Sequence, residues 1–87
     1  MYVHLGGDTV VLQKDIIAIF DLELTSISKI TREFLYVAEE EGFVVNVSED
    51  LPKSYVLTEK DNESKVYISP ISAATLLKRA NNILDEI

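Results

Sequence analysis

The sequence predicts one small α+β domain, in which a small antiparallel sheet is combined with two helices, one of them C-terminal. Three observations favour this class. Short apolar or alternating runs are separated by Gly, Pro and polar turns, which is typical of strands. Two longer segments, which begin near residues 27 and 72, space their apolar residues three or four apart, as helices do. The whole chain, residues 1–87, is short enough to form a single domain.

The N-terminal segment predicts a hairpin followed by a third strand. Residues 2–5 and 9–12 are the two arms, and the glycines of Gly6-Gly7-Asp8 can take the positive φ that a tight turn needs. The polar pair Lys14-Asp15 then interrupts the pattern. Residues 16–20 form a β-branched run, which predicts a central strand that is buried on both faces.

A first amphipathic helix is predicted from residue 27 onwards. Ser26 or Thr25 can cap its start, and Gly42 can end it in the left-handed conformation. Residues 39–41 are three glutamates at the C-terminal end, where they are best explained as a solvated helix end. The apolar face of the helix is expected to consist of Ile27, Ile30, Phe34, Val37 and Ala38.

Three further strands are predicted at residues 43–47, 54–58 and 66–69. The polar segment 59–64 between the last two strands predicts a hairpin loop with an exposed, mobile tip. Pro70 should end the pairing of the final strand because it has no N–H to donate.

The last segment, residues 72–87, predicts a second amphipathic helix with Ser72 as its N-cap. Its apolar stripe is wide. Such a stripe either covers an open sheet or docks onto a neighbouring subunit. Both can be true at once, because the inner edge of the stripe can pack on the sheet while its flank contacts the neighbouring subunit. The residues expected at a subunit interface are Leu76, Leu77, Ile83 and Leu84.

The chemical inventory of the chain is short. The chain has no cysteine, which excludes disulfides, a thiol nucleophile and thiolate metal sites. Its single histidine, His4, lies in a predicted strand without a second imidazole, so neither a metal site nor a cofactor is expected. Acidic pairs such as Asp8 with Asp15 could serve as acid and base, but exposed charge is ordinary near turns. We therefore expect no enzyme.

Hydropathy indicates that the chain does not enter a membrane. No segment approaches the roughly 20 apolar residues that span a bilayer, and the N-terminus lacks the basic-then-apolar order of a secretory signal. A cytoplasmic protein without a membrane partner is expected.

Net charge opposes binding to nucleic acid. Fifteen acidic residues against eight basic ones give a formal charge of −7, whereas duplex binding draws most of its affinity from Lys and Arg that displace counterions from phosphate. Cations gathered on one rim and repeated around an oligomer could still form a local positive surface.

Several motifs resemble the RemB-type regulators of extracellular matrix, a small bacterial family related to the biofilm regulator RemA. At the N-terminal end they are Met1 to Gly6 and Asp15 to Asp21. At the C-terminal end they are Pro52-Lys53-Ser54, Tyr67 to Ser72, Thr75-Leu76 and Lys78-Arg79-Ala80. The resemblance spans nearly the whole chain, and the motifs are distinctive as an ordered set.

The resemblance implies a pleckstrin-like antiparallel sheet or partly open barrel with helices, assembled into a ring, in a cytoplasmic regulator of biofilm matrix genes. RemA-like proteins bind DNA through arginines repeated around that ring. This chain departs from that pattern at two places. It has Lys14-Asp15 where those chains carry an arginine, and residues 49–53 read Glu-Asp-Leu-Pro-Lys where they carry paired arginines.

Two hypotheses follow from the sequence. In the first, a ring-forming regulator holds the DNA backbone through Lys14, Lys53, Lys78 and Arg79. In the second, an oligomeric adaptor without DNA binding acts through protein partners, using the last helix or the 59–64 loop. In both hypotheses the protein binds further copies of itself and forms a homo-oligomer.

Overall fold

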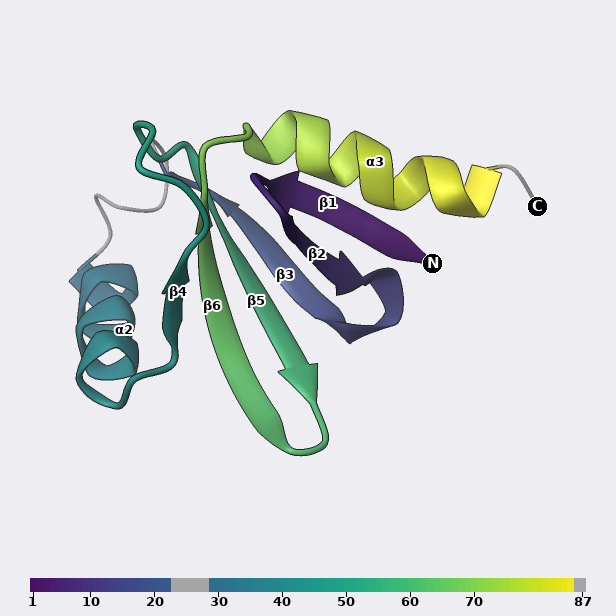
Figure 1. Ribbon diagram of the computed structural model, residues 1–87. Helices are drawn as coiled ribbons and strands as arrows, with labels where there is room; N and C mark the ends of the chain where they lie inside the picture. The colour runs from purple at the N-terminus through teal and green to yellow at the C-terminus, as the bar shows by residue number, and fades with distance from the viewer. Residues whose placement is uncertain (23–28, 86–87) are drawn as a thin grey trace.

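The computed structural model describes residues 1–22 and 29–85, and the side chains of residues 30, 31 and 82–85 fall outside this description. Figure 1 shows strands in the middle of the molecule, α2 at one side and α3 across the upper end. The elements in order are β1 (Tyr2–Gly6), β2 (Thr9–Leu12), the 3₁₀ turn η1 (Gln13–Asp15), β3 (Ile16–Asp21), α2 (Lys29–Glu40), β4 (Val44–Asn46), β5 (Ser54–Lys60), β6 (Glu63–Ser69) and α3 (Ala73–Asp85).

The strands form two separate sheets. One is the β1–β2 hairpin, and the other has the order β3-β5-β6-β4. The pairs β3–β5 and β5–β6 are antiparallel, whereas β4 runs parallel to β6. The predicted α+β class is confirmed, and the described residues contain two α-helices, one of them C-terminal. The sheets stay open and do not close into a barrel, and the larger sheet is mixed because of β4.

The N-terminal hairpin forms where the sequence predicts it. Tyr2 pairs with Leu12, and Gly6 pairs with Thr9 across the turn. Gly6 has φ +124°, and a Cβ at this position would lie 3.2 Å from side-chain atoms of Pro70 and Val47. A glycine is therefore required both for the backbone angle and for the close approach of the hairpin to the larger sheet.

The prediction for β3 is wrong in its position. Among the described strands, β3 is an edge strand that pairs with β5 alone, and none of its residues is fully buried. Ile17 is 55% exposed beside a register shift between Ile16 and Ala18. A run of β-branched residues indicates a strand but does not determine its order in the sheet, which depends on the later strands that pair with it.

The predicted hairpin over residues 59–64 is confirmed with an exposed tip, but its loop is shorter than predicted. β5 and β6 continue to Lys60 and from Glu63, so that only Asp61 and Asn62 form the turn. Both have positive φ, 52° and 65°, which is typical of a two-residue type I′ turn. The strand ends here are exposed on both faces, so they lack the apolar alternation by which a strand is recognised.

α2 ends as predicted, and two residues of its predicted apolar face, Phe34 and Val37, are exposed. The Phe43 and Gly42 amides donate to the Ala38 and Glu39 carbonyl oxygens at 2.8 and 3.1 Å, a Schellman ending with Gly42 at φ +78°. Ala38 is buried against the β4 side, whereas Val37 is 56% exposed. The capping residues Thr25 and Ser26, and the face residues Ile27 and Ile30, lie outside the described residues and side chains.

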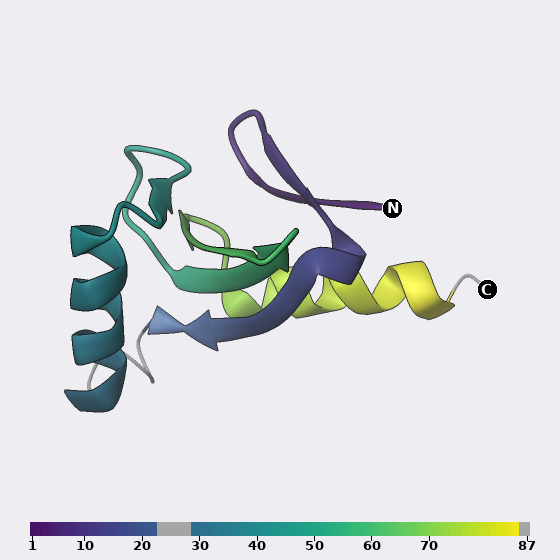
Figure 2. The same cartoon turned by 90° about the horizontal axis from the view of Figure 1, so that it is seen from below.

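α3 begins as predicted. Ser72 caps it, since the Thr75 amide donates to the Ser72 Oγ at 3.2 Å. β6 ends at Ser69, directly before Pro70, which confirms the predicted stop. α3 packs against β1 and β3, and Figure 2 shows it on the opposite side of the larger sheet from the tip of the β1–β2 hairpin.

The core lies where the hairpin, the larger sheet and α3 meet. It consists of Val3, Leu5, Val11, Val56 and Leu76. The buried Ser69 hydroxyl, at the end of β6, donates to the Leu5 carbonyl oxygen at 2.6 Å and accepts from the Ile71 amide at 3.0 Å. One side chain therefore joins the small sheet to the large sheet and to the entry of α3.

Ser69→Ala should destabilise the fold by about 1–3 kcal/mol, because it removes both hydrogen bonds of a buried hydroxyl. Thermal unfolding followed by circular dichroism would measure this as a fall in Tm of about 4–8 °C per kcal/mol. Ser64→Ala, at an exposed position of the same strand, is the control and should change stability by less than about 0.5 kcal/mol. Equal stability of the two variants would contradict the role given to Ser69.

Candidate functional site

Lys78 and Arg79 are consecutive residues of α3, and both are exposed, whereas the nearby Leu76 is fully buried. The Arg79 guanidinium donates from Nη1 to the His4 carbonyl oxygen at 2.9 Å, which ties α3 to β1. Arg79 is thus held by this hydrogen bond, and Lys78 is exposed.

Lys53 lies at the same end of the larger sheet as the start of α3. Its amide donates to the Ser69 carbonyl oxygen at 2.8 Å, and its carbonyl oxygen accepts from the Leu22 amide at 3.0 Å. The neighbouring Ser54 hydroxyl donates to the Ile71 carbonyl oxygen at 2.7 Å. Lys78 follows the first residue of α3 by five positions, which is about 8 Å along the helix axis.

Lys14 lies apart from these residues. It is exposed in η1, at the start of β3, whereas Lys53 is beside the end of β3. Six strand residues separate the two ends, which corresponds to roughly 20 Å. A single chain therefore does not bring Lys14 and Lys53 onto one surface.

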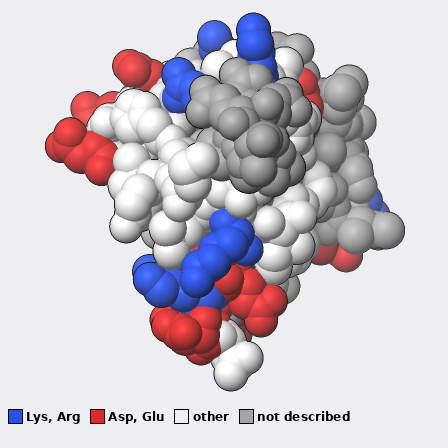
Figure 3. Space-filling model, turned by 90° about the vertical axis from the view of Figure 1, so that its right-hand side faces the viewer, with Lys and Arg blue, Asp and Glu red and all other residues white. Residues whose placement is uncertain are grey.

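Among the described residues, the predicted DNA-binding cations thus fall into two places. Lys53 lies near the start of α3 and Lys78 and Arg79 lie in its middle, and we call the three together the α3 cation surface; Lys14 is separate. Figure 3 shows Lys and Arg side chains at the upper edge of one face, and a second group lower down next to Asp and Glu side chains. Only the upper group lies at the height of α3.

The four residues predicted for a subunit interface do not share one environment. Leu76 belongs to the core of its own chain and has no exposed surface, so it cannot contact a second copy. Leu77 is 46% exposed and is available. The side chains of Ile83 and Leu84 lie outside the described part of the chain.

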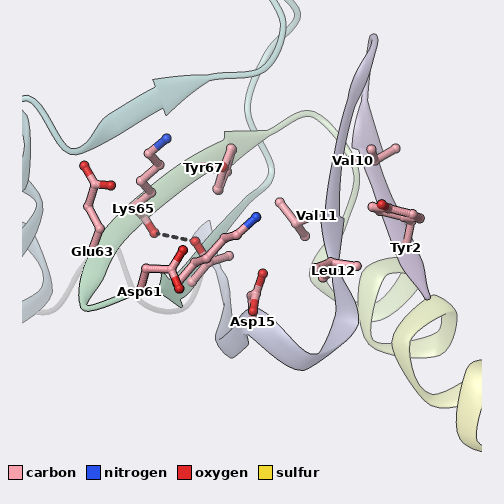
Figure 4. Close-up of a pocket in the computed structure, with 11 residues that line it drawn as sticks. Tyr2, Val10, Val11, Leu12, Asp15, Asp61, Glu63, Lys65 and Tyr67 are labelled. Atoms are coloured by element: carbon pink, nitrogen blue, oxygen red, sulfur yellow. Dashed lines mark hydrogen bonds between the residues drawn. The ribbon is translucent and has the colours of Figure 1, made fainter.

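A groove of about 350 Å³ lies between the β1–β2 hairpin and the tip of the β5–β6 hairpin (Figure 4). Tyr2 and Val10, both exposed, give it an apolar side. The charged side chains come from η1 and from the β5–β6 tip, and they are Asp15, Lys60, Asp61, Glu63 and Lys65. Sequence analysis missed this groove, because it is built from segments about 50 residues apart that carry no shared motif.

His4 and Tyr55, whose side chains can exchange protons, both lie in strands. His4 is a strand residue, as predicted, and its Nε2 donates to the Gly7 carbonyl oxygen at 2.7 Å. Burial raises the pKa of the Tyr55 phenol, so this side chain stays neutral at physiological pH. Over residues 1–22 and 29–85, no three His, Asp or Glu side chains are grouped as metal ligands. None of the helices in this part of the chain is long and apolar enough to cross a bilayer.

Comparison with known proteins identifies the family. A family model described as "Extracellular matrix regulatory protein A-like", or RemA-like, matches residues 2–80. The chain belongs to the RemA-like family. It is also 42% identical over 80 residues to "Extracellular matrix regulatory protein B" of Bacillus subtilis (strain 168), which covers 92% of this chain and 90% of that protein. The resemblance to RemB-type regulators is confirmed.

The RemA-like match places the candidate residues in the shared domain. Residues 2–80 contain Lys14 and the whole α3 cation surface. They also contain both hairpins that form the groove, but they stop before Ile83 and Leu84. The proposals below therefore use residues within this range.

Arg79→Ala should lower the free energy of unfolding by about 1 kcal/mol, because it removes the hydrogen bond that ties α3 to β1. Urea denaturation would measure this loss. Lys78→Ala removes one positive charge from the adjacent position without removing a hydrogen bond to β1. Its free energy of unfolding should stay within about 0.5 kcal/mol of that of the unchanged protein. A larger loss for Lys78→Ala would show that Arg79 is not the residue that holds α3.

Proposed function

We propose that this chain is a non-enzymatic regulator of extracellular matrix genes, which acts as a ring-like homo-oligomer and contacts the DNA backbone. The relative in Bacillus subtilis is named an extracellular matrix regulatory protein, and the family description uses the same words. The observation that carries DNA contact is the α3 cation surface.

The α3 cation surface suits phosphate better than base edges. Lys53, Lys78 and Arg79 are exposed and lie near one end of the molecule, but Arg79 also holds the His4 carbonyl. Cations of this kind position a protein on a duplex without reading sequence. Three cations per chain are few against a formal charge of −7, so repetition around an oligomer is needed for useful affinity.

A mobility shift with duplex DNA tests this function, on protein whose oligomeric mass has been measured by light scattering. If two chains of an oligomer contact the duplex, about six phosphates are engaged, and affinity should fall roughly 10³-fold between ~50 and ~200 mM salt. The double variant Lys53→Glu, Lys78→Glu should abolish retention and keep the oligomer. Arg79 is left unchanged because its hydrogen bond to the His4 carbonyl oxygen stabilises the fold.

Lys14→Glu is the control for position, because Lys14 is exposed but lies away from the α3 cation surface. It should retain most of the binding. Normal retention by the Lys53→Glu, Lys78→Glu variant, or complete loss with Lys14→Glu alone, would show that the DNA surface has been placed wrongly.

The second candidate function is an oligomeric adaptor without DNA binding. The charge of −7 and the exposed apolar side chains of α2 favour it. The 59–64 segment forms a tight hairpin whose residues are all exposed, so it presents a firm surface to a protein partner rather than a long loop. A well-formed oligomer that shifts no DNA even at ~50 mM salt would support the adaptor.

A further inference from the structure

β2 has one edge that no other described strand pairs with. It pairs with β1 alone among these strands, in a two-stranded sheet that stays separate from the larger one. Proteins often block such an edge with a charged side chain or a Pro, because its N–H and C=O groups can pair with another chain. β2 reads Thr-Val-Val-Leu and has no charged residue and no Pro. Its sequence therefore does not block the addition of a third strand.

The backbone of β2 turns hydrogen-bonding groups toward this edge. The Gln13 amide donates to the Met1 carbonyl oxygen at 2.9 Å, and successive residues of an antiparallel pair turn these groups alternately toward the partner strand and away from it. The Val10 amide, three residues before Gln13, therefore faces away from β1. His4, which pairs with Val10, follows the same alternation, because its carbonyl oxygen faces outward and accepts from Arg79 Nη1.

The groove between the two hairpins runs along this edge. Successive side chains of a strand point to opposite faces, yet Val10, Val11 and Leu12 all line the groove. A groove over one face of the hairpin would be lined by alternate residues only, so this one passes beside the edge of β2. Figure 4 shows Val11 and Tyr67 on facing sides of it. The space of about 350 Å³ therefore lies where a third strand would be added.

The other free edges of the described strands are covered or distorted. The outer edge of β1 faces α3, whose Arg79 donates to the His4 carbonyl oxygen. β3 has a register shift between Ile16 and Ala18, and α3 packs against it as well. β4 has three residues, and α2 lies beside it (Figure 1). Among these strands, β2 therefore has the least obstructed edge.

The charges around the groove favour a cationic occupant. Three carboxylates and two lysines line it, and they are Asp15, Asp61, Glu63, Lys60 and Lys65. The whole chain has a formal charge of −7, which attracts a cationic segment and repels an anionic one at longer range. A second copy of the chain has the same −7 charge, and its only two adjacent basic residues, Lys78 and Arg79, lie in a helix. The occupant that fits is therefore a different protein.

We propose that an extended, basic segment of a partner protein adds to the β1–β2 sheet along the edge of β2. Its backbone would pair with Val10, which is strand addition, and its alternate side chains would lie against exposed Tyr2 and beside the carboxylates of the groove. The inference goes beyond DNA contact and does not depend on it, because no residue of the α3 cation surface lines the groove.

A peptide-binding experiment tests this assignment. The probe is a fluorescein-labelled hexapeptide of alternating lysine and valine, and fluorescence anisotropy measures its affinity for the full chain. Val10→Pro removes the outward amide, which the β1–β2 pairing does not use, so the variant should fold, as circular dichroism would check. It should bind the probe about tenfold more weakly, since one hydrogen bond is lost. Val10→Thr keeps the amide and the β-branched shape, and it should bind as the unchanged protein does.

A second variant, Asp61→Asn with Glu63→Gln, tests the charge without touching β2. Asn suits the positive φ of the turn at position 61, so the hairpin should be kept. The affinity for the lysine–valine probe should fall, and its dependence on salt should become less steep, because two carboxylates are removed. A probe of alternating glutamate and valine should not bind the unchanged protein.

Equal affinity of Val10→Pro and Val10→Thr, or equal binding of the two probes, would overturn the inference. A lower oligomeric mass of Val10→Pro by light scattering would also overturn it, because a second copy would then fill the edge. DNA retention in the mobility shift should be the same for Val10→Pro and the unchanged protein, so these outcomes leave the proposed function standing.

Discussion

The buried Ser69 hydroxyl is the interaction on which the arrangement of the two sheets depends. The β1–β2 hairpin is a separate sheet, so ladder pairing with the larger sheet does not determine its position. The hydroxyl donates to Leu5 and accepts from Ile71, which fixes β1 against the end of β6 and the entry to α3 at the same time. The close contact of Gly6 with Pro70 and Val47 adjoins this point. The hairpin side of the groove depends on both contacts, since they determine how closely the hairpin approaches the sheet.

Local signals in the sequence predicted most element ends, because each end has a local physical cause. Ser72 caps α3, Gly42 ends α2 with positive φ, and Pro70 follows the last residue of β6. Features that depend on distant partners were not predictable in this way. The edge position of β3 and the parallel pairing of β4 result from β5 and β6, which follow them in the chain.

The candidate site was predicted only in part for a similar reason. Lys53, Lys78 and Arg79 were identified from family motifs, and the structure brings them to one end of the molecule. Sequence alone could not show that β3 separates Lys14 from Lys53. It also could not show that Leu76 is buried in the core of its own chain while Phe34 and Val37 are exposed. An amphipathic pattern predicts an apolar face, but it does not predict how much of that face the rest of the chain covers.

The two-residue turn at Asp61 and Asn62 has a consequence for how the chain folds. β5 and β6 are the central strands of the larger sheet, and the loop between them is very short, so closing it costs little entropy. Hairpins of this kind form within microseconds, whereas β3 and β4 must find their partners across much longer stretches of chain. We therefore expect the central hairpin to serve as the folding nucleus, on which the edge strands and then the N-terminal hairpin assemble.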